Sequence, residues 1–327
     1  MSSAPHHHLP DPDPAPAPSP APADISVVAL ARSFGDVHAV RDVTLTARAG
    51  EVTGLVGPNG SGKTTLLLML ATLLVPDSGE IRIGGLDPVT QSAEVRRILG
   101  WMPDVLGAWP NLSVRRSLEL TARLYGMDRR MAAARAEELT DLVDLVELID
   151  RPTRVLSRGQ KQRLSLARAL VHDPRVLLLD EPASGLDPGA RIALRVLLRR
   201  LAAEGRTVLV SSHVLAELDE LADRSVFLEA GATVTDERIA AARRTARPWR
   251  IRSLDPTGLR AALVAAGVPD DAIGVDPQGL VAPVASDEAA AALLAELVKA
   301  GAPVTAFAPA VGDLEQTFLD LNGEAGR

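Results

Sequence analysis

The stretch 51-EVTGLVGPNGSGKTT-65 places a short apolar run, a glycine-rich segment and the start of a second apolar run directly after one another. Residues 51–57 have the pattern of a buried strand, and residues 66–74 that of an apolar helix. The segment between them fits G-x-x-x-x-G-K-[ST], a pattern that binds phosphate when it follows a strand and precedes a helix. A glycine turn with an incidental lysine is the alternative. The full motif in this context instead predicts an α/β fold that binds a nucleoside triphosphate.

The residue types of this loop suit that chemistry. Gly57, Gly60 and Gly62 are expected to let the backbone curl so that its N–H groups point at phosphate oxygens. The N-terminus of the following helix adds partial positive charge. Lys63 is expected to reach the β- and γ-phosphates, and the Thr64 hydroxyl to ligate Mg²⁺. The other residues expected in the nucleotide site are Pro58, Asn59, Ser61 and Thr65.

A second apolar strand ends in two adjacent acids, in 175-RVLLLDEP-182. Such a strand would not normally end in two carboxylates unless they faced a site at its carboxyl end. Asp180 is therefore expected to hold Mg²⁺, directly or through water, and Glu181 to polarise the attacking water as general base. Solvated acids that cap the next turn are the alternative, which the nearby phosphate motif disfavours.

Composition narrows the classes of function. The chain has 327 residues, of which 46% are hydrophobic, enough for two ordinary domains. A formal net charge of −7 argues against a nucleic-acid partner, and the absence of cysteine excludes disulfides and thiolate metal sites. The apolar run 66–75 is about half of what a bilayer span needs. The proline- and alanine-rich start lacks the apolar core of a secretory signal. A cytoplasmic location is expected.

Five motifs, in order, resemble those of ATP-binding cassette proteins over about residues 24 to 240. GPNGSGKTT (57–65) is similar to the family's phosphate loop, and LLLDEP (177–182) to its second nucleotide motif. LSRGQ (156–160) is similar to the family signature, SGLD (184–187) to the D-loop, and SSH (211–213) to the switch histidine. The resemblance implies ATP and Mg²⁺ as ligands and ATP hydrolysis as the activity.

The resemblance also implies a pair of cassettes. In this family the signature of one cassette closes over the γ-phosphate held by the other, so the pair is most simply a homodimer. Ser157, Gly159 and Gln160 would then bind phosphate in trans, at the N-terminus of a helix. Three further roles follow from family positions: a γ-phosphate contact for His213, coupling of the two sites for Asp187, and stacking on adenine for Phe34.

Two positions depart from the family pattern. Asp104 stands where members usually carry glutamine, and an aspartate can ligate Mg²⁺ but cannot donate a hydrogen bond. Arg158 replaces a frequent glycine of the signature, at a position where the backbone of the loop is less dependent on glycine. Asp104 begins a helix-rich insert, residues 104–152, with helices expected over 111–127 and 132–149 and Ser113 as an N-cap. By resemblance, this insert receives the coupling helix of a membrane subunit.

The predicted fold class is a P-loop NTPase cassette followed by a small α+β, ferredoxin-like domain. The expected parts are a tail without a packed core (1–23), the cassette (24–246) and the small domain (247–327), joined by a solvated basic linker over 238–250. The small domain is predicted from its β-α-β-β-α-β order, with Asp255 and Pro256 starting its first helix. Its ending, DLEQTFLDL, resembles cassettes of two-component drug and antibiotic exporters of the daunorubicin-resistance type.

The leading interpretation is an energy-coupling ATPase at the cytoplasmic face of the membrane, working as a cassette dimer with separate transmembrane permease subunits and no nucleic acid. A soluble cassette ATPase acting on ribosomes or DNA is one alternative, but such proteins usually carry two cassettes or a long coiled coil. A regulatory nucleotide binder, with hydrolysis impaired by Asp104, is the other. The intact Lys63, Asp180, Glu181 and His213 argue against it.

Overall fold

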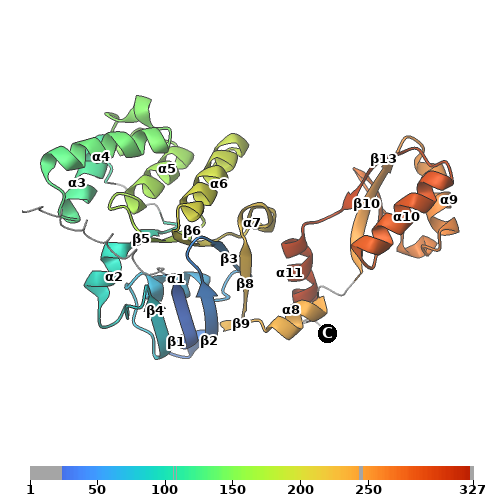
Figure 1. Cartoon of the computed structure of the whole chain (residues 1–327), viewed down its shortest axis with the longest axis horizontal. Coiled ribbons are helices and arrows are strands. Elements are labelled where there is room, and N and C mark those ends of the chain that lie inside the picture. Colours follow the sequence, from blue (N-terminus) through green and yellow to red (C-terminus); the bar gives the residue numbers. More distant parts are fainter. Residues whose placement is uncertain (1–23, 106, 108, 243–245, 325–327) are drawn as a thin grey trace, which may run out of the picture.

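The computed structural model describes residues 24–324 except 106, 108 and 243–245, so the predicted tail, residues 1–23, lies outside the described residues. The described strands form a nine-stranded sheet and a four-stranded sheet (Figure 1). No helix within these residues is long and apolar enough to cross a membrane. The fold class expected from the sequence is confirmed.

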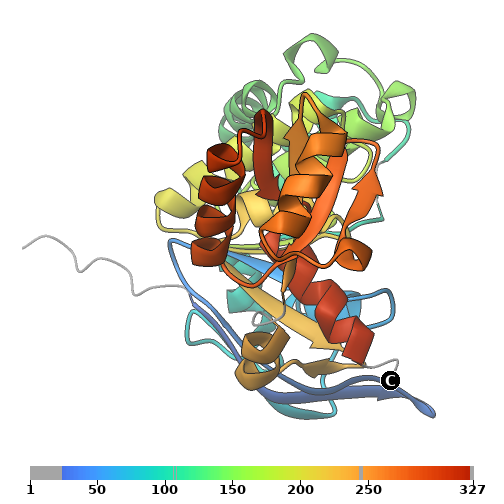
Figure 2. The ribbon, with the colours of Figure 1, turned by 90° about the vertical axis from the view of Figure 1, so that its right-hand side faces the viewer.

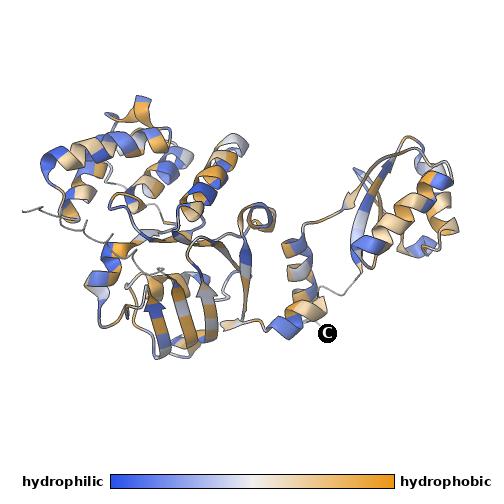
Figure 3. Cartoon of the chain, in the orientation of Figure 1, coloured by the Kyte–Doolittle hydropathy of each residue, from blue (hydrophilic) through white to orange (hydrophobic). Residues whose placement is uncertain are grey.

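The larger sheet has the strand order β4-β1-β2-β9-β8-β3-β7-β6-β5. Strands β8, β3, β7, β6 and β5 run parallel, whereas β1 pairs antiparallel with β2 and β4. Hydrophobic and polar bands alternate along β1 and β2 (Figure 3), as expected of a sheet with one exposed face. The strands are β1 (Ile25–Phe34), β2 (Val37–Ala47), β3 (Val52–Val56), β4 (Ser78–Ile83), β5 (Leu99–Met102), β6 (Val176–Asp180), β7 (Thr207–Ser211), β8 (Arg224–Glu229) and β9 (Ala232–Thr233).

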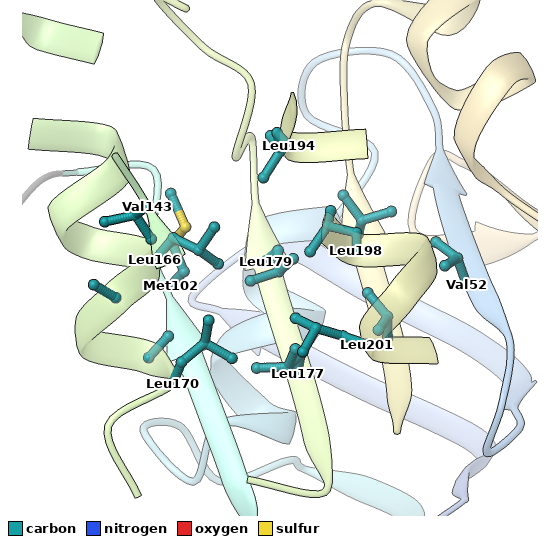
Figure 4. Close-up of a cluster of buried hydrophobic side chains, with 14 of the residues drawn as sticks. Val52, Met102, Val143, Leu166, Leu170, Leu177, Leu179, Leu194, Leu198 and Leu201 are labelled. Carbon is teal, nitrogen blue, oxygen red and sulfur yellow. The ribbon is translucent and has the colours of Figure 1, made fainter. Parts of the chain in front are cut away.

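Residues 176–179 of β6 are all apolar, as suits a strand of the parallel half of the sheet that is covered on both faces. Leu177 and Leu179 join a core with helices α5 (Arg158–Ala169) and α6 (Pro188–Ala203), shown in Figure 4. Val176 and Leu178 join a second core on the opposite face, with α1 (Lys63–Leu70). The strand that ends in the acid pair is thus fixed from two sides.

The helical insert differs in part from the prediction. Helices α3 (Val114–Leu124) and α4 (Arg129–Leu142) follow α2 (Ser92–Ile98), and the Ser113 hydroxyl caps α3 by accepting from the Arg116 N–H at 3.2 Å. The helix predicted over 132–149 stops at Leu142. Asp144 has φ +54°, a left-handed conformation that cannot continue an α-helix, and a 3-10 turn, Val146–Leu148, follows. A second 3-10 turn spans Thr153–Val155.

The small sheet has the order β11-β12-β10-β13 with antiparallel neighbours, the ferredoxin-like arrangement. Asp255 caps α9 and Pro256 is its first residue, as predicted. Figure 2 shows this unit facing the viewer. Its elements are β10 (Arg247–Ser253), α9 (Pro256–Ala265), a 3-10 turn (Asp270–Ala272), β11 (Gly274–Asp276), β12 (Gly279–Val284), α10 (Asp287–Lys299) and β13 (Val304–Pro309).

The last helix, α11 (Asp313–Glu324), packs on the larger unit, and Asp313 at its start also pairs with Arg247 of β10. It contacts α7 (Leu215–Leu221) and α8 (Asp236–Ala242), and Leu314 and Leu321 enter the larger core. The Leu314 N–H donates to Asp219 Oδ1 of α7 at 2.9 Å. The linker predicted over 238–250 is wrong at both ends, because α8 extends to Ala242 and β10 begins at Arg247. We propose that the chain divides at residue 246 and that α11 anchors the second unit on the first.

The core beneath β6 gives a stability prediction. Leu198 on α6 is fully buried in it, whereas Val196 on the same helix is 62% exposed. We expect Leu198→Ala to destabilise this unit by about 2–5 kcal/mol and Val196→Ala by less than about 0.5 kcal/mol. Urea unfolding followed by circular dichroism measures both. Equal effects of the two substitutions would contradict the packing described here.

Candidate functional site

A cleft of about 630 Å³ opens where β6 and β7 end and α1 begins. Parallel strands present their carboxyl ends at one edge of a sheet, and ligands of α/β proteins bind there. The cleft collects residues from six separate segments of the chain. They are Val37, His38 and Ala39; Asn59, Gly60, Gly62, Lys63, Thr64 and Thr65; Asp104; Arg158; Asp180, Glu181 and Ser184; and His213.

The glycines of loop 57–65 are needed for different reasons. Gly60 and Gly62 have φ +80° and +97°, conformations that side chains disfavour, as predicted. Gly57 is not in that region. A Cβ there would lie 2.5 Å from the Leu228 carbonyl oxygen and from Ser61 Oγ, so steric crowding requires the glycine. Gly57, Pro58 and Ser61 do not line the cleft.

Lys63 lies at the start of α1 with its ammonium turned back onto the loop. Its Nζ donates to the carbonyl oxygens of Gly57 at 2.7 Å and Pro58 at 3.0 Å. Burial lowers the pKa of Lys63, and the nearby Glu181 and Asp180 carboxylates raise it in part. A phosphate entering the cleft would add negative charge beside this ammonium and favour its charged form.

Asp180 is buried at the end of β6 and held by two hydroxyls. Ser211 Oγ donates to its Oδ1 at 2.6 Å, and Thr64 Oγ1 donates to its Oδ2 at 3.2 Å. The pairing of β6 with β7 puts Asp180 opposite Ser211, which explains the first contact. The predicted pair Thr64 and Asp180 therefore meets in the structure.

Glu181 adopts a strained backbone conformation. Its φ of +53° is rare for a residue with a side chain and costs on the order of 1–3 kcal/mol. Two contacts from β7 hold its N–H, which donates to Ser211 O and Ser211 Oγ, each at 3.2 Å. The ring of His213 donates from Nδ1 to Glu181 Oε2 at 2.6 Å. The structure thus brings together the two residues predicted to be catalytic.

Oxygen donors in the cleft suit a hard divalent cation. Thr64 and Asp180 are in contact, and Asp104 lines the same cleft. Among the described residues, no three carboxylate or imidazole groups form a metal-binding cluster of their own. This donor set fits Mg²⁺, which is usually bound by one or two carboxylates together with the oxygens of a substrate phosphate and water.

The remaining predicted site residues do not line the cleft of their own chain. Ser157 caps α5, and its hydroxyl accepts from the Gln160 N–H at 3.2 Å. Asp187 caps α6 by accepting from the Ala190 N–H at 3.0 Å, a bond that lowers the pKa of its carboxyl. Phe34 is 47% exposed, and the Arg32 guanidinium lies 4.9 Å from its ring centre. Gly159 and Gln160 also lie outside the cleft lining.

Sequence reasoning missed four residues that support the acid pair. The motif SSH contains Ser211 but does not indicate its bond to Asp180, and Arg158, a departure from the signature pattern, lines the cleft. Ser184 accepts a hydrogen bond from Arg158. Gln162 is buried in α5 and donates to the Glu181 carbonyl oxygen. Gln162 had a usable signal, because it is an amide between the apolar positions of an amphipathic helix.

Comparison with known proteins places this site in a family. Residues 40–184 match the sequence profile of the ABC transporter family. The chain is 37% identical over 215 residues to the ABC transporter ATP-binding protein NatA of Bacillus subtilis, covering 64% of this chain and 87% of that protein. It is 34% identical over 306 residues to the daunorubicin resistance ATP-binding protein DrrA3 of Streptomyces coeruleorubidus, covering 93% and 97%. Nod factor export ATP-binding protein I of Burkholderia lata is 40% identical over 205 residues, 63% of this chain and 67% of that protein.

A solved structure extends the likeness to the fold. The ATP-binding cassette MJ0796, a dimer in a post-hydrolysis state bound to ADP and Pi, superposes with a TM-score of 0.59 at 26% identity. The superposition covers 64% of this chain and 97% of that one. Two of the relatives are matched over 87% and 97% of their own lengths, and each of the five predicted motifs contributes at least one residue to the cleft. The chain therefore belongs to the ATP-binding proteins of ABC transporters and is an ATPase.

Proposed function

We propose that this chain drives a membrane exporter whose cargo is a drug or antibiotic. The supporting observation is the similarity to the daunorubicin resistance protein, which spans 93% of this chain. The matched region has 306 residues, so it includes the small C-terminal sheet. A Nod factor export protein is 40% identical, but only over 63% of the chain. The likeness that includes the small sheet is thus to the drug-resistance relative.

We propose that Glu181 is the general base and His213 the γ-phosphate contact. In this scheme the Glu181 carboxylate accepts a proton from the water that attacks the γ-phosphate, and the bridge to His213 orients both side chains. Lys63 leaves its two loop carbonyls to bind the phosphates, since an ammonium gains more from a charged oxygen than from a carbonyl. The gathering of all three residues in one cleft supports hydrolysis over regulatory binding alone.

We propose Thr64, Asp180 and Asp104 as the residues that hold Mg²⁺. When bound, Mg²⁺ would neutralise charge that develops on the phosphate oxygens. Thr64 and Asp180 would keep their places, because β6, β7 and α1 already fix them. Asp104 lies at the edge of the helical insert, so its carboxylate would connect the cleft to that insert.

We propose a homodimer in which each signature serves the partner's nucleotide. Ser157, Gly159 and Gln160 start α5 outside their own cleft, which supports a role in trans. The N–H groups of a helix start favour anions. A related cassette is a dimer, which also supports this arrangement. Asp187 and Phe34 keep their proposed roles in site coupling and adenine stacking; adenine would use the Phe34 face opposite Arg32.

We propose that the helical insert docks on a transmembrane permease subunit at the cytoplasmic face of the membrane. A hollow of about 320 Å³ lies beside Asp104, between the sheet and α3. It is largely apolar, with Leu73, Trp101, Val105 and Tyr125 in its lining, and Val105 is 81% exposed. An exposed apolar hollow is suited to bind a short helix of another protein. Nucleic acid is not among the proposed partners.

The role of Glu181 predicts a large loss of turnover without a loss of binding. We expect Glu181→Gln to lower Mg²⁺-dependent ATP hydrolysis by about 10²–10⁴-fold, because an amide cannot accept the proton. ATP binding should persist, and the variant should accumulate as a nucleotide-bound dimer on size-exclusion chromatography. The exposed Glu147, changed to Gln, is the matched control. Hydrolysis by Glu181→Gln at the wild-type rate would remove Glu181 from this role.

The shared-site arrangement predicts complementation between two inactive chains. Ser157→Arg and Lys63→Ala should each abolish activity as homodimers. Mixed together, they should restore roughly one working site per heterodimer, formed by the Lys63 of one chain and the Ser157 of the other. Steady-state hydrolysis of the mixture, against each chain alone, measures this. ATP hydrolysis by a strict monomer would contradict the arrangement.

The Asp104 carboxylate predicts a specific dependence on Mg²⁺. We expect Asp104→Asn to raise the Mg²⁺ concentration needed for half-maximal hydrolysis, because it removes a charged ligand. Asp104→Gln restores the residue usual in the family and should largely preserve turnover. Hydrolysis rates measured against free Mg²⁺ for the three proteins test this. Superimposable curves would show that Asp104 does not ligate the ion.

A further inference from the structure

Helix α5 contacts the acid pair of its own chain through a buried amide. Gln162 Nε2 donates to the backbone carbonyl oxygen of Glu181 at 2.8 Å, and the Gln162 side chain is only 1% exposed. A buried amide is unfavourable unless its polar atoms are bonded. Through this contact, Gln162 holds the peptide group that follows Glu181.

A second residue of α5 holds the same segment one turn earlier. Arg158 Nη2 donates to Ser184 Oγ at 2.8 Å, and residues four apart lie on one side of a helix. The Ser184 N–H donates to the Glu181 carbonyl oxygen at 3.1 Å, which closes a turn over residues 181–184. A Cβ at Gly185 would lie 2.7 Å from Arg158 Cδ, so the arginine passes closely over this turn. Gln162 and Arg158, on one side of α5, thus form hydrogen bonds to both ends of the turn.

The turn needs such support because of the backbone at Glu181. Its φ of +53° is held on the N–H side by Ser211 and on the carbonyl side by Gln162 and Ser184. If Gln162 no longer donates, the Glu181 carbonyl oxygen loses this side-chain hydrogen bond and keeps the bond from the Ser184 N–H. The backbone can then relax toward ordinary conformations and turn the carboxylate away from His213.

We infer that Gln162 is a positioning residue for Glu181 and that α5 links the two nucleotide sites of the dimer. The inference rests on the proposed shared sites, in which Ser157 completes the partner's site. Ser157 caps the helix whose second turn carries Gln162, and a capping box fixes that end. A shift of Ser157 on engaging the partner's nucleotide therefore moves the side chain that holds Glu181. The two sites are coupled through one rigid helix.

The complementing pair tests this inference, because only one of its sites hydrolyses ATP. Gln162→Met keeps the length of the side chain and removes the donor. Placed in the Ser157→Arg chain, whose own Lys63 and Glu181 work, it should lower kcat about tenfold, the cost of one hydrogen bond. The KM for ATP should stay within about twofold, since the residue does not touch the nucleotide. Placed in the Lys63→Ala chain, whose Glu181 does not take part in hydrolysis, the same change should lower kcat by a factor at least about fivefold smaller.

Lys161→Met, a change at the neighbouring half-exposed position of α5, is the matched control in both chains. Equal losses in the two placements, or a loss expressed in KM, would overturn the role of Gln162 and indicate a general disturbance of α5. An inactive pair without any Gln162 change would instead overturn the shared sites, and this coupling with them. If Gln162→Met does not fold, as judged by its melting curve, Gln162→Asn, which draws the donor back by one methylene, tests the same contact. It should show the same asymmetry between the two chains.

Discussion

The geometry of this protein depends on the pairing of β6 with β7. The two strands are parallel, so their carboxyl ends lie at one edge, and the register sets Asp180 beside Ser211. From that pairing follow the bond between Ser211 and Asp180, the two contacts that hold the Glu181 N–H, and the position of His213 just beyond β7. The phosphate loop meets the same edge because β3 pairs with β7 on its other side. Six segments that are distant in the sequence therefore meet in one cleft.

Much of this arrangement could be predicted from local patterns. An apolar run that ends in two acids predicts a doubly buried strand, and the caps at Ser113 and Asp255 were predicted from single residues. Errors occurred where tertiary structure overrides periodicity. The helix expected to 149 ends at Leu142, before the left-handed Asp144, and residues expected in a linker form α8. Periodicity alone does not indicate where a helix stops or what covers it.

Motifs predicted several of the residues that line the cleft, but they did not predict the residues that hold those side chains in place. Motifs predicted Lys63, Asp180 and His213, which the structure brings into one cleft, but the backbone strain at Glu181 and its contact with Gln162 depend on how α5 packs against β6. The spacing of residues in a sequence does not indicate that a glutamate adopts a left-handed backbone conformation, or which group a buried amide bonds. The return of α11 to α7 was missed for the same reason, because the bond from Leu314 to Asp219 joins residues 95 positions apart.

In the proposed dimer, the phosphate loop of one chain and the signature of the other enclose the same γ-phosphate. Vanadate can replace that phosphate next to ADP, and irradiation then cleaves the nearby backbone. Mass spectrometry of the fragments locates the cleavage sites. In a mixed dimer of an isotope-labelled Lys63→Ala chain and an unlabelled Ser157→Arg chain, the shared site predicts cleavage within residues 57–65 of the Ser157→Arg chain and within 156–160 of the Lys63→Ala chain, both dependent on ATP and Mg²⁺. Cleavage of both segments in the same chain would contradict it, because Arg158 also lines the cleft of its own chain.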